Sequence, residues 1–239
     1  MATKNFNNLP TSVNLHSKFD EFGLPVRPQE NRGTCSVFTV IGALEYALAI
    51  PKGKGTLLSV EFLNWASHKV ANRKVDGGFF SELWDGYKEY GICAEADLPY
   101  LPEFNLDLQP SEAILEKAKQ AFSTKLEMHW IKEWDVKTGL TDEQFLEIKK
   151  TIANQFSVCG GFRWPKDSKW DDEVLQMCPE SEVFDGHSII LEGYIDDPKL
   201  PGGGAFAIRN SGGGSRGGYM SYEYVKTYMN DALWIEPSA

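Results

Sequence analysis

The chain has 239 residues, of which 42% are hydrophobic and 24% charged, and its formal net charge at pH 7 is −10. This length suffices for one sizeable core or for two lobes that share a cleft, and the composition is typical of a soluble globular protein. Because nucleic acids and anionic membranes bind basic surfaces, the acidic balance argues against both as partners.

Early in the chain, a polar turn leads into a long apolar helix with a cysteine at the junction. The turn covers residues 29–34, and residues 36–50 leave almost no polar face, which predicts a buried helix that Pro51 ends. Thr34 is a natural N-cap, so Cys35 falls in the first turn, where free backbone N–H groups and the helix dipole favour an anion. A thiol in this position is easier to ionise.

Cys35 is a candidate nucleophile, although the simplest alternative is a buried, unreactive thiol. Gln29 argues for chemistry, because it precedes Cys35 by six positions and a turn containing Gly33 lies between them. Its side-chain amide can therefore return to the Cys35 backbone N–H. Two such donors form an oxyanion hole, which accompanies a nucleophile that attacks a carbonyl carbon.

Further helices and strands are predicted along the chain. Helices are expected over about 60–70 with Ser59 as N-cap, over 79–90 with Gly91 at the end, over 113–122, and after a capping box that starts at Thr141. Strands are expected over 126–130 and 156–162. The glycines of Asp76-Gly77-Gly78 lie between the second and third helices, where a turn is the simplest explanation.

A histidine and an asparagine flank a predicted hairpin near the end of the chain. His187 opens one β-rich run and Asn210 ends the next, with a loop rich in glycine and proline over residues 196–204. If His187 faces Asn210 in an antiparallel pair, then Tyr194 faces Gly203, which places the turn inside that loop. One hairpin would therefore bring the imidazole and the amide side by side.

Three of these segments resemble the papain-like cysteine peptidases. The nucleophile segment of that family is similar to Gln29-x-x-x-Gly33-x-Cys35, with Thr34 and Ser36 in place of a serine and an aromatic residue. Gly186-His187 before an apolar strand, and an apolar strand that ends in Arg-Asn-Ser at Asn210, resemble its histidine and asparagine segments. The chain order Cys, His, Asn also resembles that of the family.

The resemblance covers roughly residues 10–100 and 142–225, and it implies an α+β, two-lobe fold. One papain-like catalytic domain would span residues 1–239. A helical lobe, mainly residues 25–100, would hold the long central helix and the nucleophile. A β-rich, barrel-like lobe, mainly residues 101–239 with the N-terminal segment, would hold the histidine and the asparagine. The active-site cleft would lie between the two lobes.

The resemblance also implies roles for the candidate residues. Cys35 would attack a peptide carbonyl as a thiolate paired with the His187 imidazolium, which Asn210 would hold in place. Gln29 and the Cys35 backbone N–H would stabilise the oxyanion, and His187 would protonate the leaving amine and then activate water. Substrate-binding backbone would lie at Gly77, Gly78 and Gly186. The expected partners are a peptide or protein substrate and a protein inhibitor or pro-segment, with no metal and no cofactor.

Departures from the family pattern affect the site and the disulfides. The two tryptophans that follow the family's asparagine are absent after Asn210, so we expect a wetter hydrogen bond between His187 and Asn210. The family's disulfide positions near the nucleophile are occupied by other residues, namely Arg32, Ala66 and Val75. This predicts a largely disulfide-free protein, with a Cys159–Cys178 bridge as the alternative.

A cytoplasmic location is the expectation that follows from these departures. Four cysteines without the family's disulfide positions suit a reducing compartment. The opening residues lack the apolar core of a signal peptide, and no stretch of the sequence approaches the roughly 18 apolar residues of a membrane span.

Two rival functions stay open beside the peptidase. A thiol acyltransferase uses the same chemistry when an amine replaces water as the acceptor. A binding module would keep the fold without turnover, and the two absent tryptophans are the reason to consider it.

Overall fold

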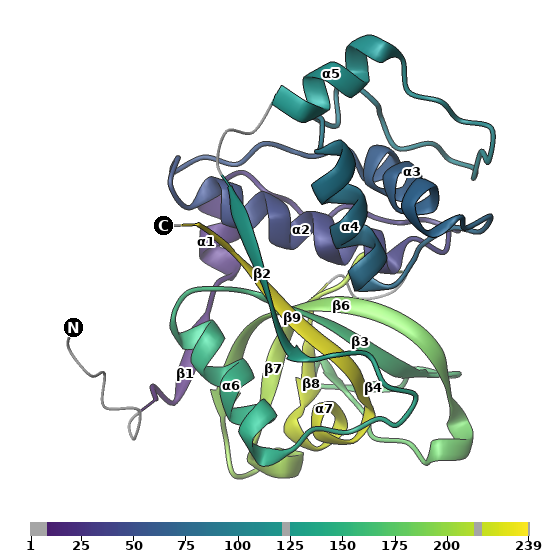
Figure 1. The fold of residues 1–239 in the computed structure, drawn as a ribbon. Coiled ribbons are helices and arrows are strands. Elements are labelled where there is room, and N and C mark those ends of the chain that lie inside the picture. The colour runs from purple at the N-terminus through teal and green to yellow at the C-terminus, as the bar shows by residue number, and fades with distance from the viewer. Residues whose placement is uncertain (1–8, 121–124, 213–216, 239) are drawn as a thin grey trace.

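The computed structural model describes residues 9–120, 125–212 and 217–238. Figure 1 shows a helical lobe stacked on a β-rich lobe, which is the α+β, two-lobe architecture expected. The helices are α1 His16–Glu21, α2 Cys35–Ala49, α3 Val60–Ala71, α4 Phe80–Tyr90, α5 Glu112–Gln120, α6 Asp142–Ala153 and α7 Tyr222–Tyr228. The strands are β1 Ser12–Asn14, β2 Leu126–Lys132, β3 Val158–Pro165, β4 Trp170–Asp171, β5 Val174–Leu175, β6 Val183–Asp196, β7 Gly204–Arg209, β8 Tyr219–Ser221 and β9 Met229–Pro237.

Helix α2 runs through the helical lobe, and all of its residues after Cys35 are buried. This explains the nearly unbroken apolar pattern, because a helix surrounded by protein needs no polar face. Thr34 is its N-cap residue, as predicted, but its side chain does not cap the helix. The Thr34 hydroxyl instead forms a 2.7 Å hydrogen bond with the hydroxyl of Tyr100.

The other helices of this lobe agree with the prediction to within one or two residues. The Ser59 hydroxyl accepts from the Phe62 amide at the start of α3, and α4 ends at Gly91, where φ is +72°. Helix α5 ends at Gln120, and residues 121 and 122 of the expected helix lie outside the described residues. Helix α5 packs with the helical lobe, although its residues fall in the range expected for the β-rich lobe.

The β-rich lobe is built on one sheet in the order β2-β9-β3-β6-β7-β8-β5-β4, with β1 paired to β6. All its pairs are antiparallel except β5 with β8. Helix α6 begins at the predicted capping box of Thr141 and packs on the sheet in Figure 1. A second core cluster joins α1, α6 and α7 to this sheet, so each lobe has its own core.

The hairpin of β6 and β7 forms, but the predicted register is wrong. Ile190 pairs with Arg209, and beyond an irregularity at Glu192 Tyr194 pairs with Phe206, not with Gly203. The predicted register would pair Ile190 with Ala207, so the strands are already offset by two residues at Ile190, and the bulge adds one more. Asn210 follows the end of β7, and it therefore reaches His187 through its side chain and not through the strand ladder.

All four cysteines are free, so the alternative Cys159–Cys178 bridge does not form. Cys93 and Cys159 are buried among the core residues. Within residues 9–120, 125–212 and 217–238, no helix is both long and apolar enough to cross a membrane.

Candidate active site

Cys35 lies at the N-terminus of α2 in a pocket of about 360 Å³ between the two lobes. The helical lobe contributes Cys35, Gly77 and Gly78 to the pocket lining, and the β-rich lobe contributes Gly186 and His187. The Cys35 thiol donates to the Gly186 carbonyl over 3.8 Å. The structure therefore brings the candidate nucleophile, the histidine and the three predicted substrate-binding glycines to one pocket.

Asn210 holds the imidazole of His187 from behind the pocket. The distance between His187 Nε2 and Asn210 Oδ1 is 2.8 Å, and Asn210 is 2% exposed. Because a carbonyl oxygen only accepts, Nε2 carries the proton in this arrangement. The other ring nitrogen, Nδ1, is then the acceptor in the neutral ring and is available to take a proton from a thiol.

The hydrogen bond between His187 and Asn210 is partly buried, and the expectation that it is wetter than in the family stays a prediction, but an indole does pack on the histidine ring. The indole of Trp164, on β3, packs edge-on against the His187 ring with 4.6 Å between the ring centroids. Trp164 is itself 9% exposed. Sequence reasoning missed this residue, because an indole supplied from β3 does not appear in the pattern that follows Asn210.

Burial disfavours both the thiolate form of Cys35 and the imidazolium form of His187. Burial raises the pKa of the Cys35 thiol, while hydrogen bonds from the backbone of Ser188 and Ser36 lower it. Burial also lowers the pKa of His187, and the hydrogen bond to Asn210 raises it. The N-terminus of α2 and the mutual attraction of the two charges must offset these burial effects for the pair to ionise.

Hydrogen bonds to both the nitrogen and the oxygen of the Gln29 side-chain amide fix its orientation. Its Nε2 donates to the Arg32 carbonyl over 2.9 Å, and its Oε1 accepts from the Ser211 hydroxyl over 3.0 Å. Its backbone N–H also donates to the Ser211 carbonyl. One side-chain N–H is left for another acceptor, which is what an oxyanion donor requires.

The glycines of the cleft wall are held by polar side chains. Gly77 has φ of +76°, and a Cβ there would lie 2.5 Å from the Gly33 carbonyl oxygen, so no side chain fits. Its amide donates to Asn64 Oδ1 over 3.0 Å, and the Gly78 amide donates to Ser36 Oγ over 3.2 Å. Ser36, which replaces an aromatic residue, therefore fixes the wall beside the nucleophile.

A buried ion cluster surrounds Arg32, one of the three residues at positions where the resemblance led us to look for disulfide cysteines. The guanidinium of Arg32 contacts Glu61 over 2.6 Å and Asp76 over 2.7 Å. Burial alone lowers the pKa of Arg32, but its hydrogen bonds to Asp76 and Glu61 more than offset this and raise the pKa overall. We call Arg32, Glu61 and Asp76 the Arg32 cluster. It connects the turn before Cys35 to the loop that carries Gly77.

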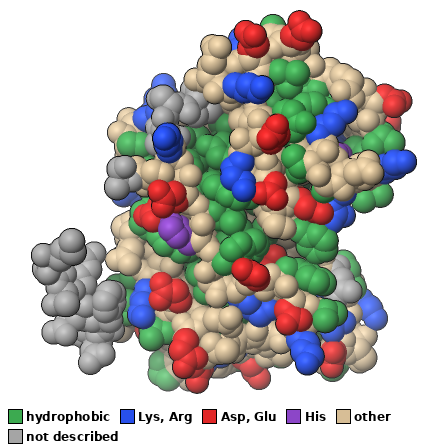
Figure 2. Space-filling model, viewed as in Figure 1, with side chains coloured by type: hydrophobic (Ala, Val, Ile, Leu, Met, Phe, Trp, Pro, Cys, Tyr) green, Lys and Arg blue, Asp and Glu red, His purple; other side chains and the backbone are tan. Residues whose placement is uncertain are grey.

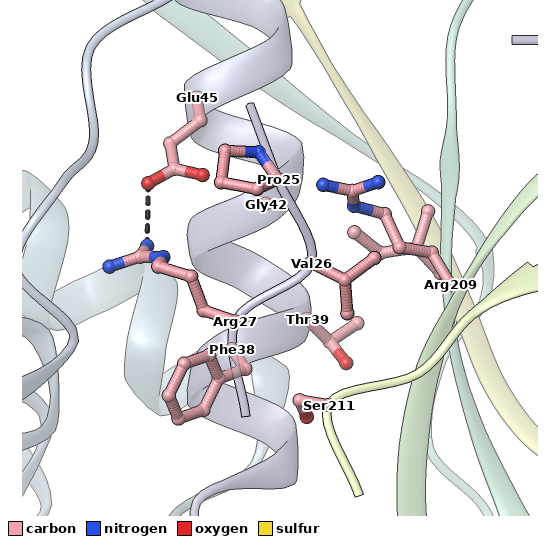
Figure 3. Close-up of a pocket in the computed structure, with 10 residues that line it drawn as sticks. Pro25, Val26, Arg27, Phe38, Thr39, Gly42, Glu45, Arg209 and Ser211 are labelled. Carbon is pink, nitrogen blue, oxygen red and sulfur yellow. Dashed lines mark hydrogen bonds and ion pairs between the residues drawn. The ribbon is translucent and has the colours of Figure 1, made fainter. Parts of the chain in front are cut away.

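A second ion cluster lies behind the site, around a small cavity of about 30 Å³. Figure 3 shows Arg27 and Arg209 on either side of α2, where Glu45 accepts from Arg27 over 2.6 Å. Arg209 also forms a 3.7 Å ion pair with Glu192. Burial raises the pKa of Glu45 to about 7, against the charge of Arg27. These contacts fix the strand end that precedes Asn210.

In the part of the chain that the structure describes, no three His, Cys, Asp or Glu side chains are grouped to hold a metal ion.

The chain is similar to known proteins over most of its length. A family model described as "Papain family cysteine protease" matches residues 9–233. Pro-cathepsin H of Bos taurus is 26% identical over 226 residues, which cover 91% of this chain and 61% of that protein. Falcipain-2a of Plasmodium falciparum is 34% identical over 194 residues, which cover 81% of this chain and 35% of that protein. The chain thus spans only part of the length of these relatives.

Solved structures show the same fold. Xylellain, a cysteine protease from Xylella fastidiosa, matches with a TM-score of 0.76 and 18% identity, covering 100% of this chain and 91% of that one. Digestive procathepsin L 3 of the Tenebrio molitor larval midgut matches with a TM-score of 0.68 and 19% identity. The match covers 99% of this chain and 72% of that one. At these identities the likeness shows the fold alone, and it confirms the expected α+β, two-lobe fold.

Proposed function

Since the chain belongs to the papain family of cysteine proteases, we propose that it hydrolyses peptide bonds with Cys35 as nucleophile and His187 as acid and base. The observation that carries this proposal is the shared pocket. Cys35 and His187 both line it, and the 2.8 Å bond from His187 Nε2 to Asn210 leaves Nδ1 free to serve the thiol. Gln29 supports the proposal with one side-chain N–H that neither the Arg32 carbonyl nor the Ser211 hydroxyl uses.

The proposed reaction has two halves. In the first, His187 takes the thiol proton, the Cys35 sulfur forms a bond to the peptide carbonyl carbon, and the oxyanion accepts from the Gln29 amide and the Cys35 backbone N–H. His187 then gives its proton to the leaving amine as the C–N bond breaks. In the second half, His187 takes a proton from water, which attacks the thioester, and the carboxylic acid leaves as the thiol is restored.

The substrate in this proposal is an extended peptide or a protein segment. Gly77 and Gly78 on one wall and Gly186 on the other let a second backbone approach closely. The similar Tenebrio molitor structure is that of a procathepsin, which supports a pro-segment or protein inhibitor as a second occupant of this cleft. The four free cysteines support the further proposal of a reducing compartment such as the cytoplasm.

The test is covalent labelling with a peptidyl epoxide, which alkylates activated thiolates, followed by mass spectrometry. We expect selective labelling of Cys35 that is lost in His187→Ala and kept in His16→Ala, a matched variant at a half-exposed histidine outside the pocket. An unlabelled Cys35 in a protein whose Cys178 still reacts with iodoacetamide would sink the proposal and favour the binding module.

Hydrolysis is separated from acyl transfer by product analysis. With a peptide substrate in the presence of a primary amine, a hydrolase yields mainly the free acid. A product that is mainly the new amide would instead assign the acyltransferase function to the same residues.

A further inference from the structure

The pocket that holds Cys35 contains a buried carboxylate that the proposed mechanism does not use. Asp231, on β9, lines this pocket and is 5% exposed. Its Oδ1 lies over Gly161 of β3, which also lines the pocket, and a Cβ on Gly161 would collide with it. The glycine therefore leaves the space in which the carboxylate sits.

The other charged side chains of this pocket are already matched within the protein. Arg73 pairs with Glu82 over 2.5 Å, and Asp76 pairs with Arg32 over 2.7 Å. Asp231, by contrast, forms no ion pair with any side chain of the described residues. Because buried charges are normally paired, the unmatched carboxylate points to a cation supplied by a ligand.

Lys132 on the neighbouring strand β2 is the described basic side chain that acts on Asp231. It acts without forming an ion pair, and its ammonium donates to the Asn230 carbonyl. Burial raises the pKa of Asp231 to about 7 despite this charge. The Gly161 backbone N–H also donates to the carboxylate and lowers its pKa, but this hydrogen bond and Lys132 together do not offset the effect of burial.

Aromatic side chains form the mouth of the same pocket. Phe79, at the start of α4, and Trp134, after β2, approach to 5.1 Å between ring centroids. They are 41% and 51% exposed, so both rings are open to a ligand. Figure 2 shows hydrophobic side chains along the middle of this face, where the two lobes meet. The Arg73 guanidinium already lies 4.9 Å from the Phe79 ring centroid, which shows that this aromatic pair accepts a cation. Aromatic faces also pack well against the aliphatic stem of a lysine or arginine.

We propose that this pocket selects peptide substrates carrying an arginine or lysine, whose stem packs on Phe79 and Trp134 and whose charged head reaches Asp231. This specificity rests on the proposed function, because the same pocket holds Cys35. A net charge of −10 acts in the same direction by attracting basic peptides over longer distances.

The size of the expected preference follows from the contact. A hydrogen bond to a charged group contributes roughly 1.5–3 kcal/mol, which is a factor of about 10 to 100 in kcat/KM. Citrulline has the shape of arginine without its charge, so comparing these two residues isolates the electrostatic contribution.

The experiment uses fluorogenic peptide amides with arginine, citrulline or leucine at each of the two positions before the scissile bond. For the native protein we expect kcat/KM to be at least about tenfold higher for arginine than for citrulline at one position. In Asp231→Asn, which keeps the side-chain shape, the ratio should fall to about 1. Asp142→Asn, at a side chain that is 91% exposed, is the matched control and should keep the native ratio.

Equal rates with arginine and citrulline in the native protein would overturn the proposal, and so would an unchanged ratio in Asp231→Asn. The native comparison decides the matter even if that variant does not fold.

A binding measurement on Cys35→Ala separates this proposal from the peptidase function. The same three peptides are titrated by fluorescence anisotropy, which needs no turnover. If Cys35→Ala binds the arginine peptide selectively but the native protein does not cleave it, the peptidase function is wrong and the proposed binding of a basic side chain by Asp231 stands. If the native protein cleaves all three peptides at equal rates, the peptidase function stands and the selectivity for a basic side chain is wrong. Equal weak binding of all three peptides to Cys35→Ala would also overturn that selectivity.

Discussion

The Arg32 cluster offers a sharp test of how this protein does without a disulfide beside its nucleophile. The perturbation is Arg32→Met, which keeps a long apolar stem and removes the guanidinium. Glu61 and Asp76 would then lie close together without a cation. Their side chains are 2% and 13% exposed, and that of Arg32 is 4% exposed, so water screens the cluster very little.

The expected cost is about 4 kcal/mol of unfolding free energy, because removing one partner of a buried ion pair typically costs 3–5 kcal/mol. Some compensation remains in the variant. Glu61 still accepts from the Leu101 amide over 3.1 Å, and Asp76 still accepts from Asn64 Nδ2 over 3.0 Å. These bonds keep the estimate below the upper end of the range.

The assay is urea denaturation followed by tryptophan fluorescence, with Arg32→Lys and a triple variant as comparisons. The triple variant Arg32→Met, Glu61→Gln, Asp76→Asn removes all three charges, so it should recover most of the lost stability. The unfolding free energy of Arg32→Lys should lie between those of the native protein and Arg32→Met, because an ammonium cannot contact both carboxylates as a guanidinium does.

A loss below about 1 kcal/mol in Arg32→Met would refute the reasoning, since that is the size of an exposed ion pair. An equal loss in the triple variant would also contradict it, because the cost would then come from packing and not from unpaired charge. A rise in KM alongside the lost stability would further indicate that the cluster positions the Gly77 loop.

Three further predictions concern the site and the thiols. Trp164→Ala should lower kcat about tenfold, and it should raise the pKa of His187 towards its ordinary value because burial holds that pKa down. Trp164→Phe should keep most of the native kcat and a His187 pKa close to the native one. Steady-state kinetics measure the first quantity and histidine NMR titration the second. Asp231→Asn should abolish a pH-dependent loss of stability. Because the Asp231 pKa rises on folding from 3.8 to about 7, the native protein should lose up to about 4 kcal/mol between pH 4 and pH 8 relative to this variant, measured by denaturation at each pH. Dithiothreitol should leave the melting temperature unchanged, since all four cysteines are free; a fall on reduction would show a disulfide.

Features that depend on neighbours in the sequence were predictable. The apolar run after Cys35, the cap at Ser59 and the capping box at Thr141 each gave a helix within one or two residues of its observed start. These signals work because helix burial and capping depend on residues three or four positions apart. The motif spacing likewise indicated His187 and the three glycines that line one pocket with Cys35.

The hairpin and the surroundings of the site could not be predicted in the same way. The register of β6 and β7 changes at a bulge near Glu192, whose position depends on packing and not on alternation. Trp164 comes to His187 from another strand, and no local pattern marks it.

By itself, the sequence determined the helix that presents Cys35, the family resemblance and the residues that could act as acid, base and orienter. Only the tertiary structure decided what surrounds them: Arg32 meets Glu61 and Asp76 across 29 and 44 positions of sequence. It also placed the unmatched Asp231 carboxylate in the pocket of the nucleophile. The physical reason is that helix formation responds to nearby residues, whereas the pairing of buried charges depends on which distant segments the folded chain brings into contact.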